Sequence, residues 1–240
     1  MDTAVVLAGG AGLRLRPYTN DKPKAMIQVY EKPLLEWIVE WLTSNGVRDI
    51  VLGVAYKKEA ITKHFGDGAR FGARIRYSVH TVEGGTAEGF RLAIKRYVNE
   101  KTFIAMNGDE LVDLNLQMFE SFHNGHGCLA TIAASPLRSP YGIVDLDEKT
   151  KNVVCFREKA VVPNTYVSIG VYVFDHDILR YIPAQGDIER TTFPRLAVKR
   201  QVKAYIHKGF WRTINTHKDL QDVAEELEKK GFFFQRRRPH

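Results

Sequence analysis

The sequence contains little cysteine and no long apolar run. Its two cysteines, Cys128 and Cys155, exclude a disulfide scaffold, and we expect both to be free thiols in a reducing compartment. No apolar run approaches the roughly 20 residues that a membrane span requires. The first residues lack the basic segment of a secretory signal peptide. We therefore expect a cytoplasmic protein without a membrane partner.

No segment rich in proline, glycine or serine divides the 240 residues, and no repeat is present, so we expect one folded domain. Lysine and arginine exceed aspartate and glutamate by 35 to 28, which gives a net charge of +7. Part of the excess lies in a basic tail, residues 233–240, which is more typical of a solvated end than of a nucleic-acid arm. We expect no nucleic-acid partner. The cations near the start suit an anionic ligand instead; they are Arg14, Arg16, Lys22 and Lys24.

Apolar patterning divides the chain into two halves. In the first half, strand-like runs alternate with helix-like segments of about ten residues, which predicts parallel βαβ units. The strand-like runs are 5–8, 49–55, 74–79 and 102–106, and the helix-like segments are 33–46, 57–65, 87–98 and 114–123.

The second half begins with four strand-like runs, 128–134, 142–147, 153–158 and 166–174. Their close spacing predicts an antiparallel or mixed region, which we expect to lie over the first half as a lid. A helix over 187–199, a strand over 202–206 and a helix over 217–230 follow. The pattern indicates an α/β domain with an inserted β region.

The most informative local feature is the glycine-rich segment Gly9-Gly10-Ala11-Gly12-Leu13-Arg14, which follows the first strand. Glycines let backbone N–H groups approach phosphate oxygens closely, and an arginine adds a charged fork. Two well-known phosphate loops are excluded. The P-loop requires a Gly-Lys-Ser/Thr end, and the dinucleotide fingerprint requires a third glycine where Leu15 stands.

The segment Gly9-Gly10-x-Gly12-x-Arg14-Leu15-x-Pro17-x-Thr19, followed by Lys22-Pro23-Lys24-Ala25-Met26, resembles the signature of the sugar-1-phosphate nucleotidyltransferases. Further similar motifs are Gly85-Thr86-Ala87, Asn107-Gly108-Asp109, Tyr141-Gly142, Phe156-Arg157-Glu158-Lys159, Gly170-Val171-Tyr172 and Phe210-Trp211. The resemblance implies a Rossmann-like three-layer α/β/α fold with a mixed central sheet. It implies one domain over residues 1–232, with a nucleotide-binding half (1–125) and a sugar-phosphate-binding half (126–232). No C-terminal β-helix domain is expected.

The resemblance also implies roles for single residues. Arg14 would neutralise the departing pyrophosphate, and Lys24 would hold phosphate oxygens of both substrates as they meet. With Asp109 they form the expected catalytic set. The residues expected to bind the nucleotide are Leu7, Ala8, Gly9, Gly10, Gly12, Arg14, Gly85 and Thr86.

Asp109 follows the apolar strand 103–106, at a carboxyl end where open α/β sheets bind ligands. A carboxylate there suits Mg²⁺, which binds one or two protein oxygens plus substrate phosphates. We expect the adjacent Glu110 to point elsewhere. Many relatives carry Trp-x-Asp-x-Gly-Thr for the second metal ligand, whereas here Thr213 replaces the aspartate. We therefore expect the amide oxygen of Asn215 to be the second ligand.

For the sugar phosphate, the resemblance points to the second half of the chain. The glutamate of Glu158-Lys159 would accept hydrogen bonds from sugar hydroxyls, and the lysine would bind the phosphate. Gly142, Ser168 and Gly170 complete the expected set, and Ser168 stands where many relatives have an asparagine. The identity of the sugar is therefore open.

The sequence offers no candidate nucleophile, and the implied reaction needs none. A sugar 1-phosphate is already largely a dianion near neutral pH, so positioning and charge stabilisation are sufficient. We expect an Mg²⁺-dependent transfer in which an NTP and a sugar 1-phosphate form an NDP-sugar and pyrophosphate. A second copy of the chain is a candidate partner, as a homo-oligomer. The sequence does not decide between two substrate combinations: a guanine nucleotide with mannose 1-phosphate, or a thymine or uracil nucleotide with glucose 1-phosphate. The alternatives are a cytidylyltransferase for an alcohol phosphate and a catalytically silent nucleotide-sugar sensor.

Overall fold

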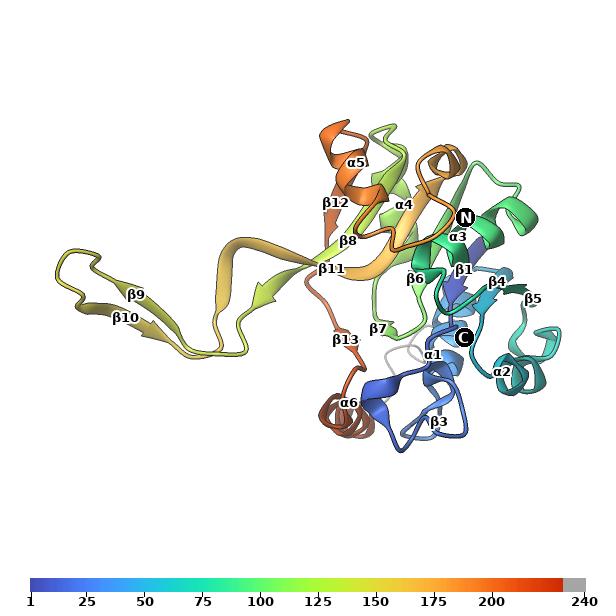
Figure 1. Cartoon of the computed structure of the whole chain (residues 1–240), viewed down its shortest axis with the longest axis horizontal. Coiled ribbons are helices and arrows are strands. Elements are labelled where there is room, and N and C mark those ends of the chain that lie inside the picture. Colours follow the sequence, from blue (N-terminus) through green and yellow to red (C-terminus); the bar gives the residue numbers. More distant parts are fainter. Residues whose placement is uncertain (231–240) are drawn as a thin grey trace, which may run out of the picture.

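A computed structural model describes residues 1–230, so the expected basic tail lies outside the described residues. Its core is a seven-stranded sheet with the order β12-β8-β11-β6-β1-β4-β5 (Figure 1). The strands are β1 (Thr3–Leu7), β4 (Asp49–Val54), β5 (Arg74–Val79), β6 (Thr102–Asn107), β8 (Ala130–Arg138), β11 (Val161–Asp175) and β12 (Val202–Ile206). β11 runs antiparallel to both of its neighbours, and the other pairings are parallel.

Side chains alternate across each strand, so the sheet has two apolar faces. On β1, Ala4 and Val6 belong to one buried cluster and Val5 to the other. The first cluster includes residues of α1 (Leu34–Ser44), α2 (Lys58–Phe65), α4 (Leu116–Asn124) and α6 (His217–Lys230). The second includes residues of α3 (Gly85–Tyr97) and α5 (Thr192–Val198). The expected three-layer α/β/α fold with a mixed sheet is confirmed.

Short elements surround these layers. Four 3₁₀ turns are found at Leu13–Leu15, Lys24–Met26, Ala69–Phe71 and His176–Arg180. Three two-stranded pairs are formed by β2 (Gln28–Val29) with β3 (Lys32–Pro33), β7 (Glu110–Val112) with β13 (Trp211–Thr213), and β9 (Ile143–Leu146) with β10 (Val153–Arg157). None of the helices within 1–230 has the length and apolar character of a membrane span.

The prediction that the inserted β region lies over the first half as a lid is wrong. β8 and β11 carry buried side chains and extend the central sheet, while β9 and β10 form an arm (residues 139–160) that projects away from the body (Figure 1). The pattern of the strands predicted their pairing, but it carried no information on the direction in which the ribbon leaves the sheet.

The expected helix over 187–199 begins five residues later, at Thr192. The preceding segment is instead bound to the start of α3. Ala87 N donates to Gly186 O over 2.8 Å, and Ile188 N donates to Thr86 Oγ1 over 2.9 Å. These contacts hold the segment against the start of α3, and residues 187–191 form a hydrogen-bonded turn before α5, in which Thr191 N donates to Asp187 O over 3.1 Å.

Candidate active site

The glycine-rich loop after β1 folds back on itself and places Lys24 beside it. Gly12 has φ +62, a conformation that favours glycine, and a Cβ there would lie 2.9 Å from Thr19 Cγ2 and 3.0 Å from Lys24 Cβ. Thr19 Oγ1 donates to Gly12 O over 2.9 Å, and Lys24 N donates to Gly10 O over 3.1 Å. The loop and the lysine therefore form one compact unit.

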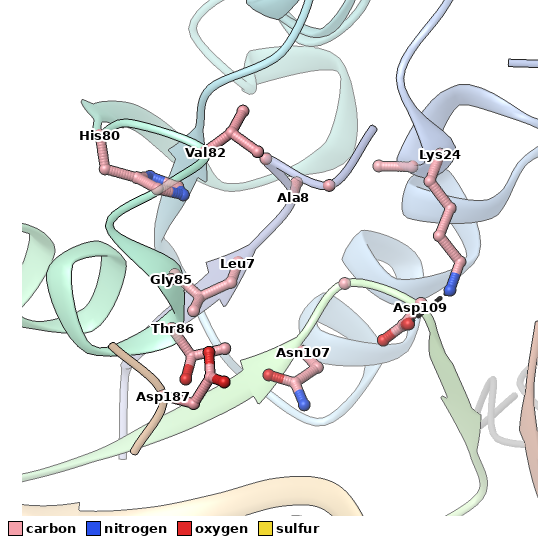
Figure 2. Close-up of a pocket in the computed structure, with 14 residues that line it drawn as sticks. Leu7, Ala8, Lys24, His80, Val82, Gly85, Thr86, Asn107, Asp109 and Asp187 are labelled. Atoms are coloured by element: carbon pink, nitrogen blue, oxygen red, sulfur yellow. Dashed lines mark hydrogen bonds and ion pairs between the residues drawn. The ribbon is translucent and has the colours of Figure 1, made fainter. Parts of the chain in front are cut away.

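A cavity of about 290 Å³ opens between this loop, the ends of β1 and β6, and the start of α3 (Figure 2). Its residues are Leu7, Ala8, Gly9, Gly10, Lys24, Ala25, His80, Val82, Gly85, Thr86, Asn107, Gly108, Asp109 and Asp187. Gly108 N donates to Leu7 O over 2.8 Å, and a Cβ on Gly108 would lie 2.5 Å from that oxygen. The two strand ends can meet because residue 108 is glycine.

Six of the eight residues expected to bind the nucleotide line this cavity, together with Lys24 and Asp109. Gly12 and Arg14 do not line it. Gly12 shapes the loop beside it, and the Arg14 side chain reaches the segment after β13 instead.

Two cations and two oxygen-bearing side chains meet at one end of the cavity. Lys24 Nζ lies 2.6 Å from Asp109 Oδ2 and 2.9 Å from Asn215 Oδ1 (Figure 2 shows the first contact). Arg14 Nη2 donates to the same Asn215 oxygen over 3.2 Å. Asp219 Oδ2 fixes Asn215, because it accepts from Asn215 N over 2.9 Å where α6 begins. The residues expected for catalysis and for the metal are therefore in one cluster.

The cluster fits a magnesium ion. Asp109 and Asn215 each direct an oxygen at one cation, the Lys24 ammonium, so their oxygens already share a cationic position. Oxygen ligands of this kind are those that Mg²⁺ prefers. Residues 1–230 contain no group of three or more His, Cys, Asp or Glu side chains that could hold a metal. A magnesium ion here would therefore take its remaining ligands from water or from substrate phosphate oxygens.

Thr213 contacts the side chain of Asn215. Its Oγ1 accepts a hydrogen bond from Asn215 Nδ2 over 3.0 Å. The threonine thereby orients the amide so that Oδ1 faces Lys24 and Arg14.

Glu110 is adjacent to this cluster and is buried, with 9% of its surface exposed. It does point elsewhere, because its Oε2 accepts from Trp211 Nε1 over 2.7 Å. Burial is the main cause that raises the pKa of Glu110 above its ordinary value, and the charge of Asp109 adds to it. Sequence reasoning missed the contact between Glu110 and Trp211 because the two residues are far apart in the chain.

The cavity is also lined by residues that were not expected to bind a substrate, among them His80, Val82, Asn107 and Asp187. His80 packs against the glycine loop, since a Cβ on Gly9 would lie 2.7 Å from His80 Nε2, and burial lowers the pKa of His80. Asn107 Oδ1 is buried without a hydrogen-bond partner. The Asn-Gly-Asp motif could have indicated Asn107, because it places that residue at the end of β6.

The expected sugar-phosphate residues are divided between two places. Gly170 (φ +68) lies at the site, where a Cβ would be 2.8 Å from Glu110 Cγ and 3.1 Å from Asn107 Nδ2. Ser168 is on β11, opposite Ala134. Gly142, Glu158 and Lys159 lie in the arm, and none of them lines the cavity. A Cβ on Gly142 would be 3.1 Å from Glu158 Oε2, so these two are neighbours. Their roles stay predictions.

The chain resembles known proteins over nearly its whole length. Residues 3–230 match a protein family described as Nucleotidyl transferase. The UTP–glucose-1-phosphate uridylyltransferase of Synechocystis sp. is 34% identical over 212 residues, which cover 80% of this chain and 54% of that protein. The mannose-1-phosphate guanylyltransferase of Mycobacterium tuberculosis is 33% identical over 232 residues, which cover 93% and 64%. The chain thus spans between half and two thirds of these relatives.

Solved structures share the fold. A crystal structure from Bacillus anthracis, in complex with sucrose, superposes with a TM-score of 0.77 at 20% identity and covers 96% of each chain. HddC from Yersinia pseudotuberculosis, complexed with GMP-PN, has a TM-score of 0.72 at 24% identity, covering 95% of this chain and all of HddC.

Proposed function

The chain belongs to the nucleotidyl transferase family of sugar-1-phosphate nucleotidyltransferases, and from this premise we propose that it joins a sugar 1-phosphate to a nucleoside triphosphate. A phosphate oxygen of the sugar phosphate attacks the α-phosphorus in line. The bond to the β-phosphate breaks, and pyrophosphate leaves with its electron pair. The products are an NDP-sugar and pyrophosphate.

The observation that carries the proposal is the position of Lys24 between Asp109 and Asn215, at the end of a glycine-lined cavity. Lys24 and Arg14 place two positive charges where phosphate groups of both substrates would meet. Their charge stabilises the charge that develops on pyrophosphate. No general base is needed, because the attacking phosphate is already largely ionised near neutral pH. This explains a site without a nucleophilic side chain.

Magnesium is the proposed cofactor. Asp109 and Asn215 would hold it, and it would neutralise charge on the phosphate oxygens. Lys24 would then exchange its contact with Asp109 for a contact with a substrate phosphate. The glycine loop binds the triphosphate through backbone N–H groups, while Gly85 and Thr86 hold the nucleoside.

The proposal names a class of substrates, a sugar 1-phosphate and a nucleoside triphosphate, before any single pair. Relatives are described as acting on glucose 1-phosphate with UTP or on mannose 1-phosphate, as guanylyltransferases. We propose one of these combinations, or thymidylyl transfer to glucose 1-phosphate, for this chain. Residues 1–125 form the nucleotide half and 126–232 the sugar-phosphate half in this proposal, so Ser168, Glu158 and Lys159 would decide the sugar.

Pyrophosphate release tests the proposal. UTP, dTTP, GTP, CTP and ATP are each mixed with glucose 1-phosphate, mannose 1-phosphate or phosphocholine in the presence of Mg²⁺. We expect release with one nucleotide and one sugar phosphate. Release with phosphocholine alone would indicate a cytidylyltransferase for alcohol phosphates. Binding of an NDP-sugar without release from any pair would indicate a silent sensor.

A second copy of the chain is the proposed partner of the arm. Phe156 lies opposite Val144, and Val153 opposite Leu146, so these side chains share one face and are 45–63% exposed. A two-stranded ribbon is marginally stable alone. Light scattering after gel filtration should give the mass of a dimer or a higher oligomer. Phe156→Glu should reduce that mass, whereas Val198→Glu, at an 87% exposed position of α5, should not. A monomeric wild type would contradict the proposal.

A further inference from the structure

Residues 1–230 bury two carboxyl groups, and they differ in their partners. Asp49 and Glu110 are each 9% exposed. Asp49 forms ion pairs with Arg74 and with Arg76, whose Nη2 lies 2.6 Å from Asp49 Oδ1. Glu110 forms no ion pair with another described residue, and its closest hydrogen bond comes from Trp211, an uncharged donor. Burying a carboxyl without a cationic partner costs free energy. The folded protein nevertheless buries the Glu110 carboxyl group next to the candidate active site.

Glu110 holds the strand that leads to Asn215. On β7 it lies opposite Thr213 of β13, and its side chain accepts from Trp211 at the other end of that short strand. Thr213 in turn orients the Asn215 amide, which contacts Lys24. A continuous set of contacts therefore connects Glu110 to the catalytic cluster, although Glu110 itself touches neither Lys24 nor Arg14 through a hydrogen bond.

Gly170 leaves the space that Glu110 occupies. A Cβ at position 170 would lie 2.8 Å from Glu110 Cγ and 3.3 Å from Glu110 Cδ. The backbone at Gly170 also has φ +68, which disfavours other residues. The glutamate is therefore confined between β11 and the Trp211 ring.

We propose that Glu110 is a positioning residue: it holds β13 through Trp211, so that Asn215 lies against Lys24 and Asp109. The requirement is for a hydrogen-bond acceptor of this length at position 110. Glutamine should satisfy it, and methionine should not. The part of the test that measures turnover rests on the proposed function, whereas the spectroscopic part does not.

The spectroscopic test follows two groups in ¹⁵N-labelled protein. The chain has three tryptophans, so Trp211→Phe identifies the Trp211 indole signal, and Asn215→Ala identifies the Asn215 side-chain amide. Glu110→Met should shift both signals, because loss of the acceptor releases Trp211 and then Asn215. Glu110→Gln should leave both near their wild-type positions. If Glu110→Met moves the indole signal and leaves the Asn215 amide unchanged, the proposal is wrong.

The kinetic test separates positioning from stability. Glu110→Met should lower kcat at least tenfold with little change in nucleotide Kd, since the cavity residues are untouched. Trp211→Phe should do the same, and the double variant should lose no more than either, because both remove one interaction. Asp49→Asn is the matched control: it should lower Tm and leave kcat unchanged. Equal loss of kcat in Asp49→Asn and Glu110→Met at matched Tm would overturn the proposal. If wild type releases no pyrophosphate, the proposed function fails while the spectroscopic result still decides the positioning role.

Discussion

Lys24 and Asp109 are 85 residues apart in the chain, and their side chains meet with Nζ 2.6 Å from Oδ2. The Lys24 side chain is 12% exposed and that of Asp109 28%, so the contact is partly screened from water. The pair joins the loop after β1 to the end of β6, and the substrates are proposed to bind between these segments.

Asp109→Ala should reduce turnover at least a thousandfold while the protein stays folded. The residue follows a buried strand and contributes no apolar contact to the core. Its loss removes the carboxylate proposed to hold magnesium and the anchor of Lys24. Steady-state rates at saturating Mg²⁺, with a circular dichroism melt as the folding control, provide the measurement. A rate within a few-fold of wild type would contradict the assigned role.

Arg14→Ala should lower kcat more than it raises the KM for the sugar phosphate. Charge on pyrophosphate grows toward the transition state, so a cation directed at it acts mainly on the rate. Arg14 does not line the cavity but contacts Asn215, one of the proposed magnesium ligands, and we propose that pyrophosphate leaves at this end. A rise in the KM for the sugar phosphate at constant kcat would place Arg14 on the other substrate.

Asn215→Ala should raise the Mg²⁺ concentration needed for half-maximal activity, and Asn215→Asp should lower it. The first change removes an oxygen ligand, and the second adds a charge at the same position. Thr213→Ala should have a smaller effect, since Thr213 contacts the amide nitrogen of Asn215 rather than Lys24. Mg²⁺ titrations of the three variants rank the Mg²⁺ concentrations that they need for half-maximal activity. A larger shift for Thr213→Ala would indicate that residue 213 provides the ligand.

Gly12→Ala and Gly46→Ala form a matched pair. Both glycines have positive φ, at +62 and +94, so the backbone strain of each substitution should cost about 1–2 kcal/mol of stability. The Cβ at position 46 meets open space, whereas the Cβ at position 12 meets Thr19 and Lys24. Activity should therefore fall at least tenfold in Gly12→Ala and stay unchanged in Gly46→Ala. Equal activities would show that the loop tolerates displacement of Lys24.

His123 should make the protein less stable in acid. Burial, with a smaller contribution from His126, lowers the pKa of His123 from its ordinary value of 6.5 to about 4. The unfolded chain therefore binds a proton first as the pH falls, and stability is lost between about pH 6.5 and pH 4, by up to about 3 kcal/mol. Urea unfolding across this range should show a shallower pH dependence for His123→Gln. An unchanged pH dependence would exclude His123 as a cause.

Local patterns predicted much of this fold. The first four parallel strands match the predicted runs to within two residues. Three of them, β1, β4 and β6, are almost wholly buried and so apolar on both faces, whereas the edge strand β5 alternates. The glycine loop, Lys24 and Asp109 were predicted to act together, and the structure brings them to one cavity.

Features that depend on distant contacts were missed. The expected helix at 187–199 begins only at Thr192, and the segment before it binds the start of α3 through Gly186 and Ile188, a contact that no local pattern indicates. Likewise, the contact between Glu110 and Trp211 was missed, because no local pattern links two residues that are 101 positions apart. The arm was misplaced because strand pairing is a local property, whereas the direction of a ribbon depends on its partners.

The path of the phosphate oxygens through the reaction distinguishes attack by the sugar phosphate from every other transfer. The sugar 1-phosphate that releases pyrophosphate is prepared with ¹⁸O in its phosphate group and incubated with the matching NTP and Mg²⁺, and the products are examined by ³¹P NMR. If the sugar phosphate attacks the α-phosphorus, all of the label should remain in the NDP-sugar, and the pyrophosphate should carry none. Label in pyrophosphate, or no NDP-sugar from any pair of substrates, would contradict the account.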